Sequence, residues 1–277
     1  MVALPAGTRI GVVRLRVRDL AREADFYRDV LGLLELERSD ERATFAAADW
    51  TPLLELLHAP DAPLRPARST GLYHFALLYP DRAALGAAVR DVAAAGHPFH
   101  GFSDHLVSEA VYLADPENNG IELYRDRPES EWEWRGDSVV MSTERLDVQA
   151  LLADADPTPP VPGRSERLRM GHVHLHVADR IRAAEFYTRV IGFDVTTRDY
   201  PGAIFLSANR YHHHLGLNEW AGKSPPPAGA TGLADFEIVV PDDAALRGIA
   251  ERAHGSVTKG SLRLRDPDGH EVVIRVG

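Results

Sequence analysis

The segment 210–218, RYHHHLGLN, places three histidines in succession. Imidazole binds metal ions and exchanges protons near neutral pH, so the run could hold a metal or supply an acid–base group. Apolar residues precede it at 203–206 and follow it at 215–217, which indicates a β-strand. Successive side chains of a strand point to opposite faces, so we expect His213 to face away from its two histidine neighbours. The three imidazoles are therefore not expected to share one ion.

A second cluster, HVHLHV, has histidines at alternate positions, His172, His174 and His176. On a strand all three point to one face, and neighbours are separated by ~6.6 Å at ~3.3 Å per residue. An ion with bonds of ~2.1 Å to nitrogen cannot reach two of them. We expect at most one of the three to bind a metal, with the others lining the same cavity or packing at its end.

The elements that must position these side chains are repeated along the chain. Residues 12–33, VVRLRVRDLAREADFYRDVLGL, align without a gap with residues 172–193, HVHLHVADRIRAAEFYTRVIGF, at an offset of 160. Both copies are typical of a strand, an Asp at the helix start, an amphipathic helix and a glycine stop. Weaker copies begin at 73 and 235 and end in an Asp-Pro turn before a last strand.

These repeats predict an α+β fold built from four βαβββ modules. One module cannot cover its own sheet, so modules must pair into two domains with cupped mixed sheets. The predicted modules span 9–60, 71–128, 170–222 and 231–277. By sequence, a first domain covers 1–130 and a second covers 169–277, joined by a connecting segment at 131–168 with a proline-rich linker at 154–166.

The bulk composition limits the class of partner. A chain of 277 residues has room for two domains, and its net charge of −10 argues against a nucleic-acid or anionic membrane surface. The absence of cysteine excludes disulfides, Fe–S clusters and thiol catalysis. We found no signal peptide and no apolar run long enough for a membrane helix. We expect a cytoplasmic protein without nucleic-acid or membrane partners, with a homodimer left open.

This arrangement resembles the vicinal oxygen chelate superfamily, which includes glyoxalases, bleomycin- and fosfomycin-resistance proteins and type I extradiol dioxygenases. The resemblance covers nearly the whole chain and is most specific in GLYHFALLYPDR, GHVHLHV and SANRYHHHLGLN. The chain is most similar to the two-domain catechol 2,3-dioxygenases. The resemblance implies a non-haem Fe(II) enzyme, with Mn(II) as the alternative metal. Such an enzyme cleaves a catechol or related dihydroxy-aromatic substrate with O₂.

The resemblance also implies a ligand set, because this superfamily takes metal ligands from the first strand and the last strand of a module. In modules two and three these positions hold His74, Glu122 and His172. Two histidines and one carboxylate leave three coordination positions open, as non-haem Fe(II) oxygenases require. In module one the equivalent of His172 is Val12, and in module four the equivalent of Glu122 is Val273.

The chain thus departs from familiar extradiol enzymes, whose site lies between modules three and four. The triad is complete only if module two pairs with module three, and module one with module four. One alternative pairs module one with two and uses Glu55 beside His74 and Glu122, as in a glyoxalase- or fosfomycin-type site. A third interpretation treats His74 and Glu122 as satisfied polar residues on interior strands.

The resemblance further assigns three residues to catalysis. His213 is the second histidine of the family's Asn-x-x-His-His segment, where the acid–base residue stands. Tyr112 lies ten residues before Glu122, where the family has a tyrosine, and His105 precedes it. Tyr112 could instead be a core aromatic residue, and His105 an exposed one. The competing functions are a glyoxalase-type isomerase or lyase and a non-catalytic protein that binds aromatic compounds.

Overall fold

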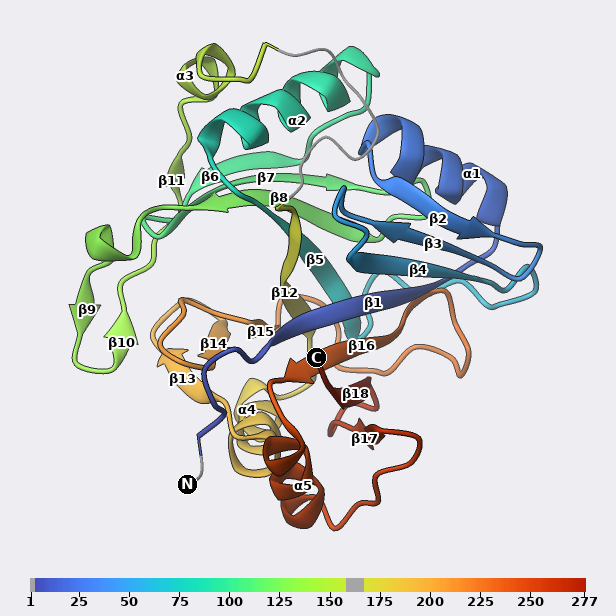
Figure 1. Ribbon diagram of the computed structural model, residues 1–277, viewed down its shortest axis with the longest axis vertical. Helices are drawn as coiled ribbons and strands as arrows, with labels where there is room; N and C mark the ends of the chain where they lie inside the picture. Colours follow the sequence, from blue (N-terminus) through green and yellow to red (C-terminus); the bar gives the residue numbers. More distant parts are fainter. Residues whose placement is uncertain (1–2, 158–166) are drawn as a thin grey trace.

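A computed structural model describes residues 3–157 and 167–277, and its elements follow the predicted modules (Figure 1). Module one contains β1 (Arg9–Val17), α1 (Leu20–Asp25), the π-helical turn η1 (Phe26–Val30), β2 (Leu34–Arg38), β3 (Arg42–Ala46) and β4 (Pro52–His58). Module two contains β5 (Gly71–Tyr79), α2 (Arg82–Ala94), β6 (Gly101–Asp104), β7 (Ser108–Ala114) and β8 (Gly120–Asp126).

The second half repeats this order. Module three contains β12 (Arg169–His176), α4 (Arg180–Phe186), the π-helical turn η3 (Tyr187–Ile191), β13 (Asp194–Thr197), β14 (Ala203–Ser207) and β15 (Leu215–Asn218). Module four contains β16 (Gly232–Val240), α5 (Asp243–Arg252), β17 (Ser261–Arg265) and β18 (Glu271–Val276). The strand expected between α5 and β17 is reduced to a bridge between Thr258 and Ser261, because Lys259 and Gly260 turn the chain with φ of 51° and 76°.

The two large sheets each combine one module from each half of the chain. The strand order is β17-β18-β16-β1-β4-β3-β2 in one sheet and β11-β6-β7-β8-β5-β12-β15-β14-β13 in the other. The first strands meet at both centres, where β1 pairs antiparallel with β16 and β5 with β12. The expected pairing of module one with four and of two with three is therefore confirmed. The sequence halves 1–130 and 169–277 mark the duplication, and neither supplies a complete sheet.

The connecting segment 131–168 is more structured than a linker. It continues from the short helix η2 (Glu129–Glu131) into a hairpin of β9 (Trp134–Arg135) and β10 (Ser138–Val139), which projects from the body in Figure 1. It then adds β11 (Glu144–Arg145) to the edge of the nine-stranded sheet and α3 (Val148–Ala153) beside α2. Most of the predicted proline-rich linker lies outside the described residues.

The tyrosine of each repeated Phe-Tyr pair connects a module of one sheet to the Asp-Pro turn of a module in the other sheet. The buried Tyr27 of module one donates a hydrogen bond of 2.8 Å to Asp115, in the Asp-Pro turn of module two. Tyr187 of module three bonds Asp266 of module four in the same way, at 3.0 Å. Because each tyrosine is buried, its hydroxyl needs such a partner. These two bonds tie the sheets together at corresponding places.

The opening histidines do not form a strand. β14 ends at Ser207 and β15 begins at Leu215, and the histidines lie in the connection between them. Asn209 and Arg210 adopt left-handed conformations with φ of 55° and 57°, which reverse the chain before the first histidine. The apolar pattern on both sides therefore belongs to two antiparallel strands rather than one. No helix among the described residues is long and apolar enough to cross a membrane.

Candidate metal centre

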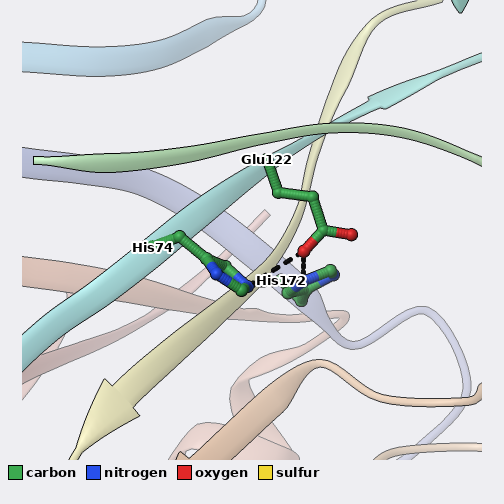
Figure 2. Close-up of side chains that lie close together, drawn as sticks. All are labelled: His74, Glu122 and His172. Atoms are coloured by element: carbon green, nitrogen blue, oxygen red, sulfur yellow. Dashed lines mark hydrogen bonds and ion pairs between the residues drawn. The ribbon is translucent and has the colours of Figure 1, made fainter. Parts of the chain in front are cut away.

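Three adjacent strands bring His74, Glu122 and His172 to one point (Figure 2). On β5, Ala76 pairs with Glu122 of β8 on one side and with His172 of β12 on the other. His74 lies two residues before Ala76 and so projects from the same face. The methyl group of Ala76 is small enough to leave room between the three larger side chains. The register of these strands thus creates the cluster that the sequence predicts from modules two and three.

The separations of the three ligand atoms suit one metal ion. His74 Nε2 lies 3.0 Å from Glu122 Oε2, His172 Nε2 lies 3.2 Å from the same oxygen, and the two nitrogens are 3.3 Å apart. Ligands ~2.1 Å from one ion and at right angles to each other are ~3.0 Å apart. The side chains therefore have the spacing of one triangular face of an octahedron.

Burial favours a bound cation at this point. The three residues are 1–4% exposed, so the carboxylate has almost no contact with solvent. Burial alone would raise the pKa of Glu122, but His172 and His74 hold that pKa well below its usual range. Burial also lowers the pKa of His172 to about 4, which leaves its imidazole neutral at pH 7. Imidazoles bind a metal in their neutral form, and two of them with an ionised carboxylate would give the ligand set one negative charge, which suits a divalent cation.

An arginine stands at the corresponding place in the seven-stranded sheet. Arg14 pairs with Asp235 in register, as His174 pairs with His74 in the other sheet. Its guanidinium forms ion pairs of 2.7 Å each with Glu55, Asp235 and Glu237. Burial would lower the pKa of Arg14, but hydrogen bonds to Glu237 and Asp235 raise it above its ordinary value. The guanidinium of Arg14 thus neutralises three carboxylates in the sheet of modules one and four, which lacks the metal ligands.

This arrangement contradicts the alternative ligand set with Glu55. Glu55 lies on β4, in a different sheet from His74 and Glu122, and its carboxylate is engaged by Arg14. Among the residues that the structure describes, His74, Glu122 and His172 form the one group with metal-ligand spacing. A glyoxalase-type set that spans modules one and two therefore does not form.

His213 lies beside the cluster, and its two histidine neighbours do not line the cavity. The ring centroids of His213 and His172 are 4.1 Å apart, and His213 lines the cavity that contains Glu122 and His74. His214 Nδ1 instead accepts a hydrogen bond from the Ala208 amide and lies 3.0 Å from the Ser207 hydroxyl, and His214 does not line the cavity.

His212 connects His213 to a carboxylate, which the strand interpretation missed. His212 Nε2 lies 2.8 Å from Asp126 Oδ1, and His212 Nδ1 lies 2.7 Å from His213 Nδ1. Since a carboxylate can only accept, Nε2 of a neutral His212 carries the hydrogen and its Nδ1 accepts. His213 must then donate from Nδ1, which leaves the Nε2 lone pair of His213 free. Burial and the neighbouring histidines lower the pKa of His213 well below its ordinary value, so the lone pair is available at pH 7.

Tyr112 and His105 form a hydrogen-bonded pair at the opposite wall. Tyr112 lies across from Glu122 in the register of β7 and β8, and its hydroxyl is 2.7 Å from His105 Nε2. His105 Nδ1 is 2.7 Å from the carbonyl of Ser142, to which it donates. In neutral His105 the Nε2 atom therefore accepts from Tyr112. Burial and the charge of Glu122 raise the pKa of Tyr112 well above its ordinary value, so its hydroxyl stays protonated.

The cavity in front of the cluster has a volume of about 270 Å³ and is mostly aromatic. His174 contributes to its wall, whereas His176 lines an adjoining cavity. Tyr200 and Thr143 are hydrogen-bonded to each other at its edge. The remaining lining side chains include Tyr73, His100, Met141, Phe205 and Trp220. This size and composition suit a single aromatic ring with a small number of polar contacts.

The chain is similar to known proteins in sequence and in fold. A sequence model of the Glyoxalase/Bleomycin resistance protein/Dioxygenase superfamily matches residues 9–123 and 169–274. A curated protein of Bacillus subtilis (strain 168), named catechol-2,3-dioxygenase, is 41% identical over 278 residues, which cover 96% of this chain and 96% of that protein.

Two solved structures share the fold at low sequence identity. Glyoxalase I from Zea mays superposes with a TM-score of 0.60 at 18% identity, over 98% of this chain and 92% of its own. The cppA protein from Streptococcus pneumoniae TIGR4 superposes with a TM-score of 0.56 at 15% identity, over 97% of this chain and 98% of its own. At these identities the two structures support the fold alone.

Proposed function

The chain belongs to the Glyoxalase/Bleomycin resistance protein/Dioxygenase superfamily, and from this premise we propose that it is an extradiol ring-cleaving dioxygenase. We propose that His74, Glu122 and His172 hold Fe(II) and that the substrates are a catechol-type dihydroxy-aromatic compound and O₂. The observation that carries the proposal is the convergence of two histidines and one carboxylate beside a free imidazole lone pair. The 41% identity to a catechol-2,3-dioxygenase supports it.

The ligand set explains the choice of metal. Two histidines and one carboxylate are the set used by non-haem Fe(II) oxygenases. When bound there, Fe(II) supplies adjacent open positions for the catechol oxygens and O₂, and the electrons that activate O₂. The surrounding side chains decide how the ring is oriented and where its protons go.

His213 is suited to accept a proton from a substrate hydroxyl. Its free Nε2 lone pair belongs to a ring that lines the cavity beside His172. A proton on Nε2 makes His213 an imidazolium, which donates from Nδ1 to His212 more strongly than the neutral ring does. Asp126 holds His212 in the tautomer that can accept this bond. The same proton can later be returned to the ring-opened product.

Tyr112 is suited to orient the substrate. Its hydroxyl hydrogen is directed to His105, so its oxygen can accept a hydrogen bond from a hydroxyl in the cavity. Because the pKa of Tyr112 is raised, it does not compete with the substrate as an anion. The aromatic walls, including Phe205 and Trp220, offer the ring of the substrate apolar contact surface. His213 as proton acceptor and Tyr112 as orienting hydroxyl, both of which line the cavity, are the two roles proposed for this chain.

The experiment that tests the proposal is anaerobic loading of the metal-free protein with Fe(II), followed by O₂ uptake with a panel of catechols. We expect uptake of one O₂ per catechol and recovery of both oxygen atoms in the ring-opened product. Parallel loading with Mn(II) and Zn(II) separates the redox reaction from a glyoxalase-type isomerisation, which proceeds without O₂. A protein that binds catechol but consumes no O₂ with Fe(II) or Mn(II) would refute the proposal in favour of a binding protein.

A further inference from the structure

A second cavity adjoins the metal centre and contains an arginine. The cavity has a volume of about 500 Å³ and shares Tyr73, His74, His100 and Tyr112 with the smaller cavity. Arg65, from the segment between β4 and β5, lines it together with residues from both sheets. The two cavities therefore meet at the wall that carries a metal ligand and the orienting tyrosine.

The Arg65 guanidinium has no counter-ion among the described residues. Its Nη1 atom is buried and has no hydrogen-bond partner in this part of the chain. Burial lowers the pKa of Arg65, and no carboxylate opposes that shift. A guanidinium nevertheless stays charged in proteins, and a buried charge without a partner is costly. Arg65 is half-buried and lines the cavity, so the part of its guanidinium that is not covered can bind an anion.

The backbone around Arg65 leaves room for the guanidinium. Gly71 and Gly232 have φ of 137° and 97°, and a Cβ atom on Gly71 would lie 2.6 Å from Arg65 Nη1. A Cβ on Gly232 would lie 3.5 Å from Arg65 Cδ. The arginine is thus held between the first residues of β5 and β16, one from each sheet. This position is defined by close backbone contacts and not by a charged partner.

The cavity also contains one carboxylate, that of Glu117, which is only partly satisfied. Its Oε1 accepts hydrogen bonds from the backbone amides of Arg18 and Asp19, and its Oε2 is buried without a hydrogen-bond partner among the described residues. His176 lies beside Gly71 in the strand register and donates from Nδ1 to Asn218, at 2.6 Å. Neither Glu117 nor His176 pairs with Arg65, so an anion that binds Arg65 would not have to displace either side chain.

The distance between Arg65 and the metal centre defines the length of the ligand. The guanidinium contacts Gly71, which precedes His74 by three residues on β5, so the two ends are ~10 Å apart at ~3.3 Å per residue. One aromatic ring at the metal centre is too short to reach that far. An anionic group would have to be carried on a side chain of several bonds.

We propose that Arg65 forms a carboxylate subsite, and that the preferred substrate is a dihydroxy-aromatic ring with an acidic side chain. This inference rests on the proposed function, since it assumes that the ring binds at the triad. The planar guanidinium fork matches a carboxylate with two parallel hydrogen bonds. The substrate therefore spans both cavities, with its hydroxyls at the metal centre and its acid at Arg65.

The test compares an acid with its neutral amide. The ligands are 3-(3,4-dihydroxyphenyl)propionate and the corresponding primary amide, and the proteins are wild type, Arg65→Met, Arg65→Lys and Arg68→Met. Arg68 is exposed and does not line the cavity, so Arg68→Met is a control with the same change in charge. Binding is measured without O₂ by tryptophan fluorescence, and turnover by O₂ uptake, with unsubstituted catechol as the reference substrate.

We expect wild type and Arg68→Met to bind the acid at least about 10-fold more tightly than the amide, as for a charge-assisted pair. Arg65→Met should reduce this preference to within about 2-fold, whereas Arg65→Lys should keep part of it. The control Arg68→Met should leave kcat/KM for unsubstituted catechol unchanged. Equal binding of acid and amide by wild type, or an unchanged preference in Arg65→Met, would overturn the subsite. If the preference for the acid depends on Arg65 but no protein consumes O₂, the subsite is upheld and the dioxygenase activity is refuted. If the protein consumes O₂ with catechol but shows no preference that depends on Arg65, the activity is upheld and the subsite is refuted.

Discussion

Replacement of His212 by alanine tests whether the histidine beside His213 positions it for proton transfer. In the folded chain His212 Nδ1 lies 2.7 Å from His213 Nδ1, and Asp126 lies 2.8 Å from the other nitrogen of His212. The substitution removes the acceptor that holds His213 with its Nε2 lone pair free. Hydrogen bonds to a charged group contribute about 1.5–3 kcal/mol, and this bond gains that character when His213 is protonated. We expect kcat to fall by roughly 10- to 100-fold, since about 1.4 kcal/mol corresponds to a factor of ten.

The loss of kcat in His213→Ala is the reference for the loss in His212→Ala. Loss of a general acid–base group typically costs ~10²- to 10⁴-fold, so His213→Ala should be more damaging than His212→Ala. Neither residue is a ligand, and both variants should retain iron. His212→Asn keeps an acceptor near the position of Nδ1 and should recover part of the rate lost in His212→Ala.

The assay is steady-state O₂ uptake with catechol, together with iron analysis of each protein. His214→Asn is the matched control, because His214 is also a buried histidine of this connection but bonds Ser207 and Ala208 instead. It should stay within about 3-fold of wild type. If His212→Ala were as active as His214→Asn, or if it lost its iron, the proposed connection from Asp126 to His213 would be wrong.

Three further predictions concern the metal, the second sheet and pH. His74→Ala and His172→Ala should each abolish Fe(II) binding in equilibrium dialysis, whereas Glu55→Gln should leave it intact; the reverse would restore the glyoxalase-type set. Arg14→Met should lower the free energy of unfolding by about 3 kcal/mol in urea, because three carboxylates lose their cation; an unchanged free energy of unfolding in this variant would contradict the assigned role of Arg14. Burial lowers the pKa of His172 to about 4 and of His214 to about 3, so the unfolded chain takes up protons below pH ~6.5 that the folded chain does not. The metal-free protein should thus have its full stability above pH ~6.5. Below that pH, its free energy of unfolding should fall by up to ~1.4 kcal/mol for each of these groups and for each pH unit. Equal urea midpoints at pH 7.5 and 5.5 would contradict this prediction.

Much of the architecture could be predicted because the chain repeats itself. The offset of 160 residues relates Val12 to His172, and the loss of ligands in modules one and four requires modules two and three to pair. The observed strand order agrees. The structure also brings His74, Glu122 and His172 within metal-ligand distance, although their roles remain predictions.

The histidine connection, the contact of His212 with Asp126 and the surroundings of Arg65 could not be predicted from the periodicity of the sequence. Two left-handed residues, Asn209 and Arg210, split the expected histidine strand into a hairpin, and neither is a glycine that would have signalled a turn. The contact between His212 and Asp126 joins residues 86 positions apart, so local spacing could not reveal it. The role of Arg14 could have been found from the offset, because it is the equivalent of His174 and lies opposite Asp235. Arg65 lies in an irregular segment between modules, where no repeat indicates its neighbours.

We propose that one iron per chain, held by modules two and three, supports ring cleavage. The most direct measurement is titration of anaerobic, metal-free protein with Fe(II), with the rate of O₂ uptake on catechol recorded at each addition. Activity should rise linearly and reach a plateau at one Fe(II) per chain, and His172→Ala should show no activity at any ratio. A plateau at two Fe(II) per chain, or an active His172→Ala protein, would contradict the account.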